Sequence, residues 1–253
     1  MVEEVEGIVI REVKYRDADR ILTLYTKEYG RITASANGAR RMKSPLHGVT
    51  LPFVRGEYSI YFGRKMNRIQ SGQILSSHYG ISENLDQLAY GQYLFELVAL
   101  TTPEGESNER DYALLAKTLE VLTKVSGGAL RSLIHAFELK HLAFLGLRPQ
   151  LSACAVCGKQ ESNFRYFHAQ HGGAICSDCV RKTRGSMRVS ESVIPAMRFL
   201  LMTSFEEIIV HPIPEPELKQ IETCILEFIF LQTDRRDFRS LAFLRQIQAS
   251  SSD

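Results

Sequence analysis

Hydrophobic and polar positions alternate through the first 75 residues with the two-residue period of β-strands. The alternation is cleanest around Ile32 and Ala34 and again around Tyr58 and Ile60. Because successive side chains of a strand point to opposite faces, each strand would bury one face and expose the other. The pattern predicts five strands, at residues 6–13, 20–26, 31–36, 51–62 and 68–75.

Residues that tolerate a positive φ stand between these predicted strands. Gly30 closes one turn, and Gly63 and Asn67 bracket another. Five antiparallel strands in a segment of this length suit a small closed barrel, such as an OB-fold.

From Ser82 onward the hydrophobic period becomes that of a helix, with Leu85, Leu88 and Phe95 on one stripe. Glycines at 127 and 128 and prolines at 212, 214 and 216 interrupt the pattern, as expected between helices. The pattern predicts helices at residues 82–100, 109–125, 129–147, 190–203 and 215–231.

Two reactive side chains fall on or beside hydrophobic helix stripes. His141 lies in the middle of one stripe, where a core histidine with satisfied hydrogen bonds is more common than a ligand. Cys224 lies beside another, which favours a buried thiol over a nucleophile.

The strongest local motif is a pair of Cys-x-x-Cys units, formed by Cys154, Cys157, Cys176 and Cys179 with eighteen residues between the pairs. This spacing is typical of a zinc site, because each tight turn aims two sulfurs at one ion. Four thiolates leave no coordination position for water, so one structural Zn²⁺ per chain is expected. A redox dithiol, an iron–sulfur cluster and a Cys₃His shell that uses His168 or His171 are the alternatives.

Motifs of several enzyme classes are missing from the sequence. It has no Walker-type phosphate loop, no Gly-x-Ser-x-Gly elbow and no His-Glu-x-x-His helix. A zinc-dependent nucleobase deaminase would need His-x-Glu and Pro-Cys-x-x-Cys, and neither occurs. We therefore expect a binding protein and no enzyme.

Charge is unevenly distributed along the chain. Lys and Arg number 13 against 8 Asp and Glu in residues 1–80, and 6 against 2 in residues 151–190, whereas acidic residues outnumber basic ones in the rest. The two basic blocks favour a polyanion as partner, with ordinary charge scatter as the alternative.

The first residues have no basic n-region, and no segment is long and apolar enough to span a membrane. Paired cysteines of this kind suit a reducing compartment, so a cytoplasmic protein without a membrane partner is expected.

Two clusters of cations are candidates for DNA binding. Arg40, Arg41 and Lys43 lie in a glycine-containing loop after the third predicted strand. Loops and sheet faces of small barrels bind nucleic acid through cations on phosphates and aromatic rings on bases. The second cluster consists of Arg64, Lys65 and Arg68, with Tyr61 nearby. The alternative is that both clusters are solvated turns.

The order of these parts resembles one known family. The barrel-like strands are followed by the loop Gly-Ala-Arg-Arg-Met-Lys-Ser at 38–44, by Phe-Glu-Leu-Lys-His-Leu-Ala-Phe-Leu-Gly-Leu-Arg-Pro at 137–149 and then by the cysteine motif. The runs at 7–10 and 17–26 also match the start of that family. The chain thus strongly resembles the RecO family of bacterial DNA repair proteins over nearly its whole length, with residues 190–253 the least distinctive.

The resemblance implies an α+β multidomain fold, in which an N-terminal five-stranded OB-fold barrel precedes an α-helical domain with an inserted Cys₄ zinc element. The expected segments are 1–80 for the barrel, 81–150 and 189–253 for the two helical parts, and 151–188 for the zinc element. It further implies that Arg40, Arg41 and Lys43 match the family's basic DNA-binding loop and that the four cysteines match its zinc ligands.

The resemblance also implies a function in DNA repair and homologous recombination. RecO proteins bind single- and double-stranded DNA, anneal complementary strands and, with RecR, help to load RecA onto DNA coated with single-strand-binding protein. The C-terminal tail of that protein is an implied partner, and association with the nucleoid during repair is implied as well.

Two rival hypotheses are a protein-interaction adaptor and a zinc enzyme of unrecognised type.

Overall fold

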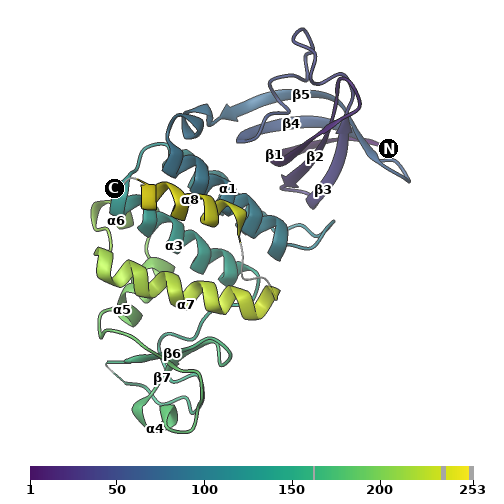
Figure 1. The fold of residues 1–253 in the computed structure, drawn as a ribbon. Helices are drawn as coiled ribbons and strands as arrows, with labels where there is room; N and C mark the ends of the chain where they lie inside the picture. Colours follow the sequence, from purple (N-terminus) through teal and green to yellow (C-terminus); the bar gives the residue numbers. More distant parts are fainter. Residues whose placement is uncertain (162, 235–237, 251–253) are drawn as a thin grey trace. The chain divides into compact units, whose positions relative to one another are not determined.

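The computed structural model describes residues 1–161, 163–234 and 238–250. The chain divides into two compact units (Figure 1). The first comprises Met1–Thr123 and the helix that begins at Arg239, and the second comprises Lys124–Phe238. Each unit has its own core and is described separately.

Five strands close into the barrel of the first unit. β1 spans Val2–Tyr15, β2 spans Asp19–Thr26, β3 spans Gly30–Ala36, β4 spans Val54–Tyr61 and β5 spans Asn67–Ser77. Their order in the sheet is β1-β2-β3-β5-β4, and the barrel closes because β1 also pairs with β4. All pairs are antiparallel except β3 with β5, which are parallel and pair at only two positions. This arrangement confirms the predicted five-stranded, OB-like barrel.

The predicted alternation sorts side chains between the barrel's interior and its surface. Ile32, Ala34, Tyr58 and Ile60 are buried in the barrel core, whereas Tyr61 is 45% exposed. Hydrophobic burial at these alternate positions fixes the strand register, because a slip of one residue would exchange the two faces.

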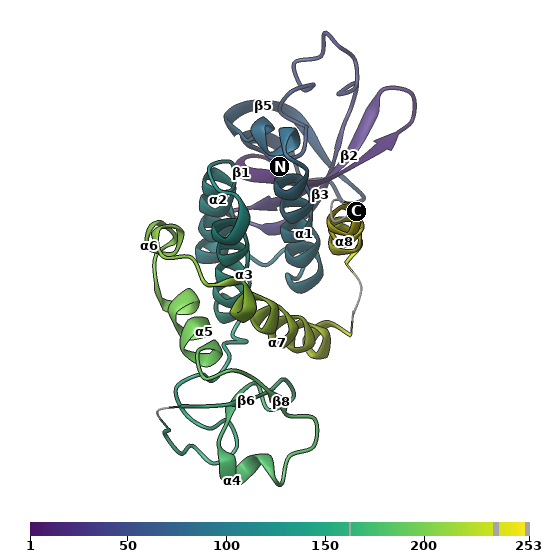
Figure 2. The ribbon, with the colours of Figure 1, turned by 60° about the vertical axis from the view of Figure 1, so that its left-hand side comes forward.

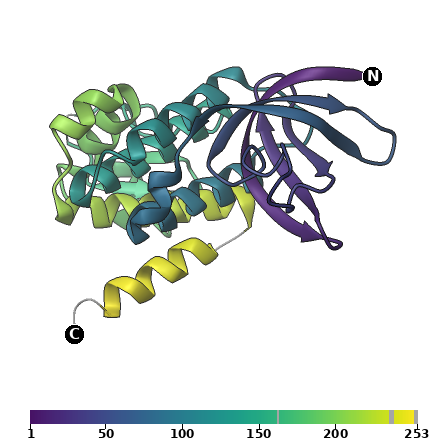
Figure 3. The same cartoon turned by 90° about the horizontal axis from the view of Figure 1, so that it is seen from above.

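Three α-helices pack within the first unit: α1 at Leu85–Thr101, α2 at Glu109–Leu122 and α8 at Arg239–Ser250, with a short 3₁₀ helix at Tyr79–Glu83 before α1. The side chains of Asn84 and Asn108 cap α1 and α2 by accepting hydrogen bonds from backbone N–H groups. Helix α8 lies alongside α1 (Figures 2 and 3). The C-terminal segment of the chain thus completes the packing around α1.

Two buried contacts join the barrel to these helices. The ring of Phe53 stacks on that of Phe95 in α1, with centroids 4.7 Å apart. The hydroxyl of Tyr25 in β2 donates a 2.7 Å hydrogen bond to the Asp111 carboxylate in α2. Burial and the Asp111 carboxylate both raise the pKa of Tyr25, so its phenol remains a donor at neutral pH.

The second unit combines four α-helices with the cysteine-rich segment. Helix α3 spans Gly127–Phe144 and contacts α5 at Val193–Met202, α6 at Phe205–Val210 and α7 at Glu215–Thr233. His141 is fully buried and stacks on Phe137, and Cys224 is 1% exposed. Both predictions of core side chains are therefore confirmed.

Three of the described α-helices were not indicated by the sequence pattern. These are α6, α8 and a short helix, α4, at Ser177–Val180. Helices α4 and α6 have only four and six residues, and α8 follows a stretch without a clear period. In the structure, α1 and α2 belong to the same compact unit as the barrel, and α3 belongs to the unit of the later helices. The expected segments 1–80, 81–150, 151–188 and 189–253 stay a prediction about domains. Among the described residues, no helix is long and apolar enough to cross a membrane.

We predict that Tyr25→Phe destabilises the first unit by about 1–3 kcal/mol, because the fully buried Asp111 carboxylate loses a hydrogen-bond donor. Denaturant unfolding monitored by circular dichroism measures the change. Tyr61→Phe is the matched control and should stay within about 0.5 kcal/mol of the native protein, since Tyr61 is 45% exposed. Equal stability of the two variants would contradict the prediction.

Candidate metal centre and nucleic-acid interface

The four paired cysteines lie in a small element built on a three-stranded sheet. Strand β6 at Tyr166–His168 pairs with β7 at Gly173–Ile175 and with β8 at Met187–Arg188. A bridge between Gln150 and Gly173 ties the preceding chain to β7. A Cβ atom at Gly173 would lie 2.1 Å from the Gln150 carbonyl oxygen, so only glycine permits this approach.

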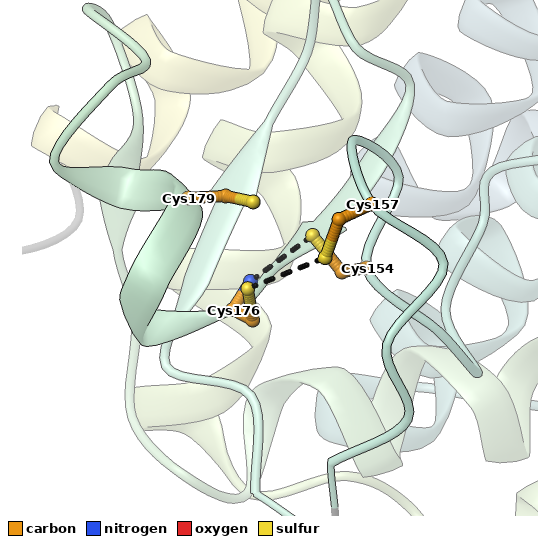
Figure 4. Close-up of side chains that lie close together, drawn as sticks. All are labelled: Cys154, Cys157, Cys176 and Cys179. Carbon is orange, nitrogen blue, oxygen red and sulfur yellow. Dashed lines mark hydrogen bonds between the residues drawn. The ribbon is translucent and has the colours of Figure 1, made fainter.

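Each cysteine pair sits on a tight turn. In the first turn the N–H of Gly158 donates to the Cys154 carbonyl, and Gly158 has a φ of +74°. In the second, Cys176 precedes the short helix α4 at Ser177–Val180, which contains Cys179. The two turns face each other, and their four side chains point toward a common centre (Figure 4).

The separations of the sulfur atoms fit a tetrahedral metal ion. All four sulfurs lie within 4.8 Å of one another. The Sγ atoms of Cys157 and Cys176 are 3.7 Å apart. Sulfurs about 2.3 Å from a tetrahedral Zn²⁺ would be separated by about 3.8 Å. The cluster could therefore hold a metal ion, and its donor set is compatible with zinc.

Without a cation the four thiols cannot all ionise. Burial raises the pKa of Cys154, but backbone N–H groups of Cys176, Cys157 and Val156 outweigh it and lower that pKa to about 6. Hydrogen bonds with Cys157 and Cys176 raise the pKa of Cys179 to about 12. One thiolate therefore forms readily, and a bound dication would be needed to hold the others deprotonated.

The ring of His168 contacts backbone groups and not the sulfur cluster. His168 Nε2 lies 2.8 Å from the Arg184 carbonyl oxygen, and His168 Nδ1 accepts from the N–H of His171. Both ring nitrogens of His168 are thus in use. Among the described residues, the sulfur cluster has four cysteine ligands and no histidine, which disfavours the Cys₃His alternative.

The predicted basic loop follows β3 and packs against the turn between β1 and β2. The backbone N–H of Arg40 donates to the Ala18 carbonyl, and its guanidinium donates to the carbonyls of Arg16 and Asp17. Arg40 is therefore half-buried and partly committed to this turn, whereas Arg41 and Lys43 are exposed. The cluster is an ordered loop at the barrel surface.

Strand pairing determines where the second predicted cluster lies. Arg68 in β5 pairs with Ser35, the penultimate residue of β3, and with Tyr61 in β4. Arg68 and Tyr61 are exposed, and so are Arg64 and Lys65 in the turn between β4 and β5. Strand pairing thus places the second cluster beside β3, the strand that leads into the basic loop.

Two residues absent from the sequence prediction extend this surface. Tyr15 and Arg16 form the tip of the β1–β2 hairpin, which extends from the barrel (Figure 2). The Arg16 guanidinium lies 5.1 Å from the centroid of the exposed Tyr15 ring. Their only sequence signal was one cation beside one tyrosine in a turn, which is common and carries no information alone.

Comparison with known proteins gives one consistent match. The family model "Recombination protein O N terminal" matches residues 1–78, and "Recombination protein O C terminal" matches residues 82–242. A DNA repair protein RecO of Alkaliphilus metalliredigens is 33% identical over 250 residues, which cover 98% of this chain and 100% of that protein. One of Pelotomaculum thermopropionicum is 31% identical over 239 residues, which cover 94% of this chain and 92% of that protein.

We predict that Gly173→Ala opens the cysteine cluster, because the new Cβ would force β7 away from Gln150. The rate at which an aromatic disulfide reagent labels the four clustered thiols should rise. Gly80→Ala is the control, since its Cβ would meet only the Thr123 methyl at 3.9 Å, and its labelling rate should equal that of the native protein. Unchanged labelling of Gly173→Ala would refute the role of the close approach.

Proposed function

The chain belongs to the RecO family of DNA repair proteins, and we propose that it is a recombination mediator that binds DNA and anneals complementary strands. Membership of this family supports a role in DNA repair and recombination. The charged and aromatic side chains on the surface of the barrel support DNA binding in particular.

One arrangement supports DNA binding most strongly: the cations and aromatic rings that are scattered in sequence gather on the barrel's outer face. Arg41, Lys43 and Arg68 would neutralise phosphates, while Tyr61 and Tyr15 could stack on bases. Because phosphate contacts carry no sequence information, such a surface would accept any strand. Both single- and double-stranded DNA are therefore proposed ligands.

Annealing by this surface would need no catalytic side chain. The cations reduce the repulsion between two DNA backbones and hold the strands close, and base pairing then selects the complement. We therefore propose a protein without enzymatic activity. If about four phosphates of single-stranded DNA are neutralised, log affinity should fall with log salt with a slope near −3.

We propose that the four cysteines bind one structural Zn²⁺ per chain. Four thiolates complete a tetrahedral shell, so the ion would contribute to folding and would not activate a water molecule. A site of this kind contributes on the order of 10 kcal/mol to local folding.

Further partners follow from the family alone. We propose cooperation with RecR, recognition of the C-terminal tail of single-strand-binding protein, and help in loading RecA onto DNA. The proposed place of action is the cytoplasm, at the nucleoid during repair.

We predict one zinc per chain at neutral pH and progressive loss of zinc as the pH falls, because protons compete with the ion for every thiolate. Metal analysis after dialysis at a series of pH values measures this. Cys157→Ser should lower the zinc content, whereas Cys224→Ser should leave it unchanged, because Cys224 is buried in α7 and its pKa is raised to about 12. Iron in place of zinc, or zinc lost with Cys224→Ser, would contradict the proposal.

We predict that the triple variant Arg40→Glu, Arg41→Glu and Lys43→Glu loses strand annealing, because it places three negative charges beside the DNA backbone. The assay follows fluorescent complementary oligonucleotides coated with single-strand-binding protein. Circular dichroism and zinc content should match those of the native protein.

The outcomes of this assay separate the hypotheses. Annealing by the native protein and none by the folded variant would support the mediator function and the basic loop. Equal annealing by both would move the DNA site elsewhere. No annealing by the folded, zinc-loaded native protein would favour a protein-interaction adaptor.

A further inference from the structure

The zinc element carries more cations than its own acidic groups can pair. Lys159 bonds to Asp178 at 3.0 Å and to Glu161 at 3.3 Å. Arg165 pairs with Glu191. The segment 151–190 has four further cations: Arg181, Lys182, Arg184 and Arg188. None of them forms an ion pair within 4.0 Å with another described residue. All four are exposed and lie within eight residues of one another in sequence, and they are here called the zinc-element cations.

The backbone that carries these cations is anchored to the metal centre. The N–H of Lys182 donates to the carbonyl of the cysteine ligand Cys179 at 2.9 Å. The carbonyl of Arg184 lies 2.8 Å from His168 Nε2, and Arg188 in β8 pairs with Tyr166 in β6. The chain between α4 and β8, which carries these cations, is therefore held in place at several points (Figure 2).

We propose that the zinc-element cations form a second binding site for the phosphodiester backbone of nucleic acid, on a different compact unit from the barrel surface. This inference rests on the proposed DNA-binding function. Four exposed cations within eight described residues, none of them in an ion pair within 4.0 Å, match a repeating anion better than a single charged group.

The surroundings of the cluster favour a nucleic-acid backbone over an acidic peptide. Peptide partners usually place apolar anchors in pockets, whereas phosphate contacts need cations and hydrogen-bond donors. Among residues 177–190, all of which the structure describes, no large hydrophobic side chain is exposed. The hydroxyls of Thr183 and Ser186, which lie 2.9 Å apart, add polar groups between the cations.

A site on each unit would allow one chain to hold two DNA strands at once. The barrel would bind one strand and the zinc-element cations would bind the other. Loss of zinc would then weaken the second site. The segment that carries the cations is held by a hydrogen bond from Lys182 to the Cys179 carbonyl and by the pairing of β8 with β6, both next to the cysteine cluster.

The test is a bridging assay with the zinc-loaded full chain. Bead-bound oligo-dT captures fluorescent oligo-dT only if the protein binds two strands together, since the two oligonucleotides cannot pair. The variant Arg181→Gln, Lys182→Gln, Arg184→Gln and Arg188→Gln should bind a single short oligonucleotide but capture the second about tenfold less or worse. Capture by the native protein should fall with salt with a log–log slope of about −3.

Two control variants separate charge from folding. Arg110→Gln, Lys117→Gln, Lys124→Gln and Lys219→Gln remove four other exposed cations and should leave capture unchanged. Arg181→Lys, Arg184→Lys and Arg188→Lys keep the charge and should also capture the second strand. Zinc content of each variant shows that the element is folded. If the four-glutamine variant loses zinc, the pairs Arg181→Gln with Lys182→Gln and Arg184→Gln with Arg188→Gln replace it, and each should reduce capture.

Three outcomes would overturn the inference. A native protein that binds one oligonucleotide but never captures a second would refute the second site and leave the proposed function intact. Undiminished capture by the zinc-loaded four-glutamine variant would assign bridging to other residues, such as two barrels in a dimer. The third outcome is that the protein binds poly-glutamate through the zinc-element cations, while their substitution does not change capture of the second strand. That result would assign these cations to an acidic protein partner. A native protein with no affinity for DNA at all would instead remove the proposed function itself.

Discussion

Closure of five strands into a barrel determines where the charged side chains of the first unit can lie. Because β1 pairs with both β2 and β4, the hydrophobic residues at alternate positions must fill one interior, and the polar residues between them face solvent. The two parallel pairs between β3 and β5 complete this ring and set Arg68 beside Ser35. Barrel closure thus places the Tyr61–Arg68 pair beside β3, the strand that leads into the basic loop.

The second unit depends on a different constraint. Its cysteine-rich element is built on three strands of two or three residues each, and four thiols converge inside it. Despite burial, backbone N–H groups lower the pKa of Cys154, whereas hydrogen bonds with Cys157 and Cys176 raise the pKa of Cys179, so the four thiols do not ionise together without a cation. A bound dication would hold all four thiolates deprotonated and, through the hydrogen bond from the N–H of Lys182 to the Cys179 carbonyl, would order the cation-rich chain that follows.

Local features of both units could be predicted from the sequence, whereas features created by long-range pairing could not. The alternation around Ile32 and Tyr58 and the spacing of the cysteines are local, and the structure agrees with both. The contact between Arg68 and Ser35 depends on a strand pair more than thirty residues apart in sequence. Likewise, the packing of α8 on α1 is a long-range contact that the sequence pattern does not indicate. Tyr15 and Arg16 become candidates for DNA binding only because the structure places them beside the basic loop.

The central claim is that DNA lies on the outer face of the barrel, and covalent mapping of the contact tests it most directly. A single-stranded oligonucleotide with photoreactive thymidines would be cross-linked to the zinc-loaded native protein, and the modified peptides identified by mass spectrometry. The account predicts cross-links in the β1–β2 hairpin, the basic loop and the β4–β5 segment, with Tyr15 and Tyr61 as the main sites. Cross-links confined to the helices α1, α2 and α3, with none on the barrel, would contradict it.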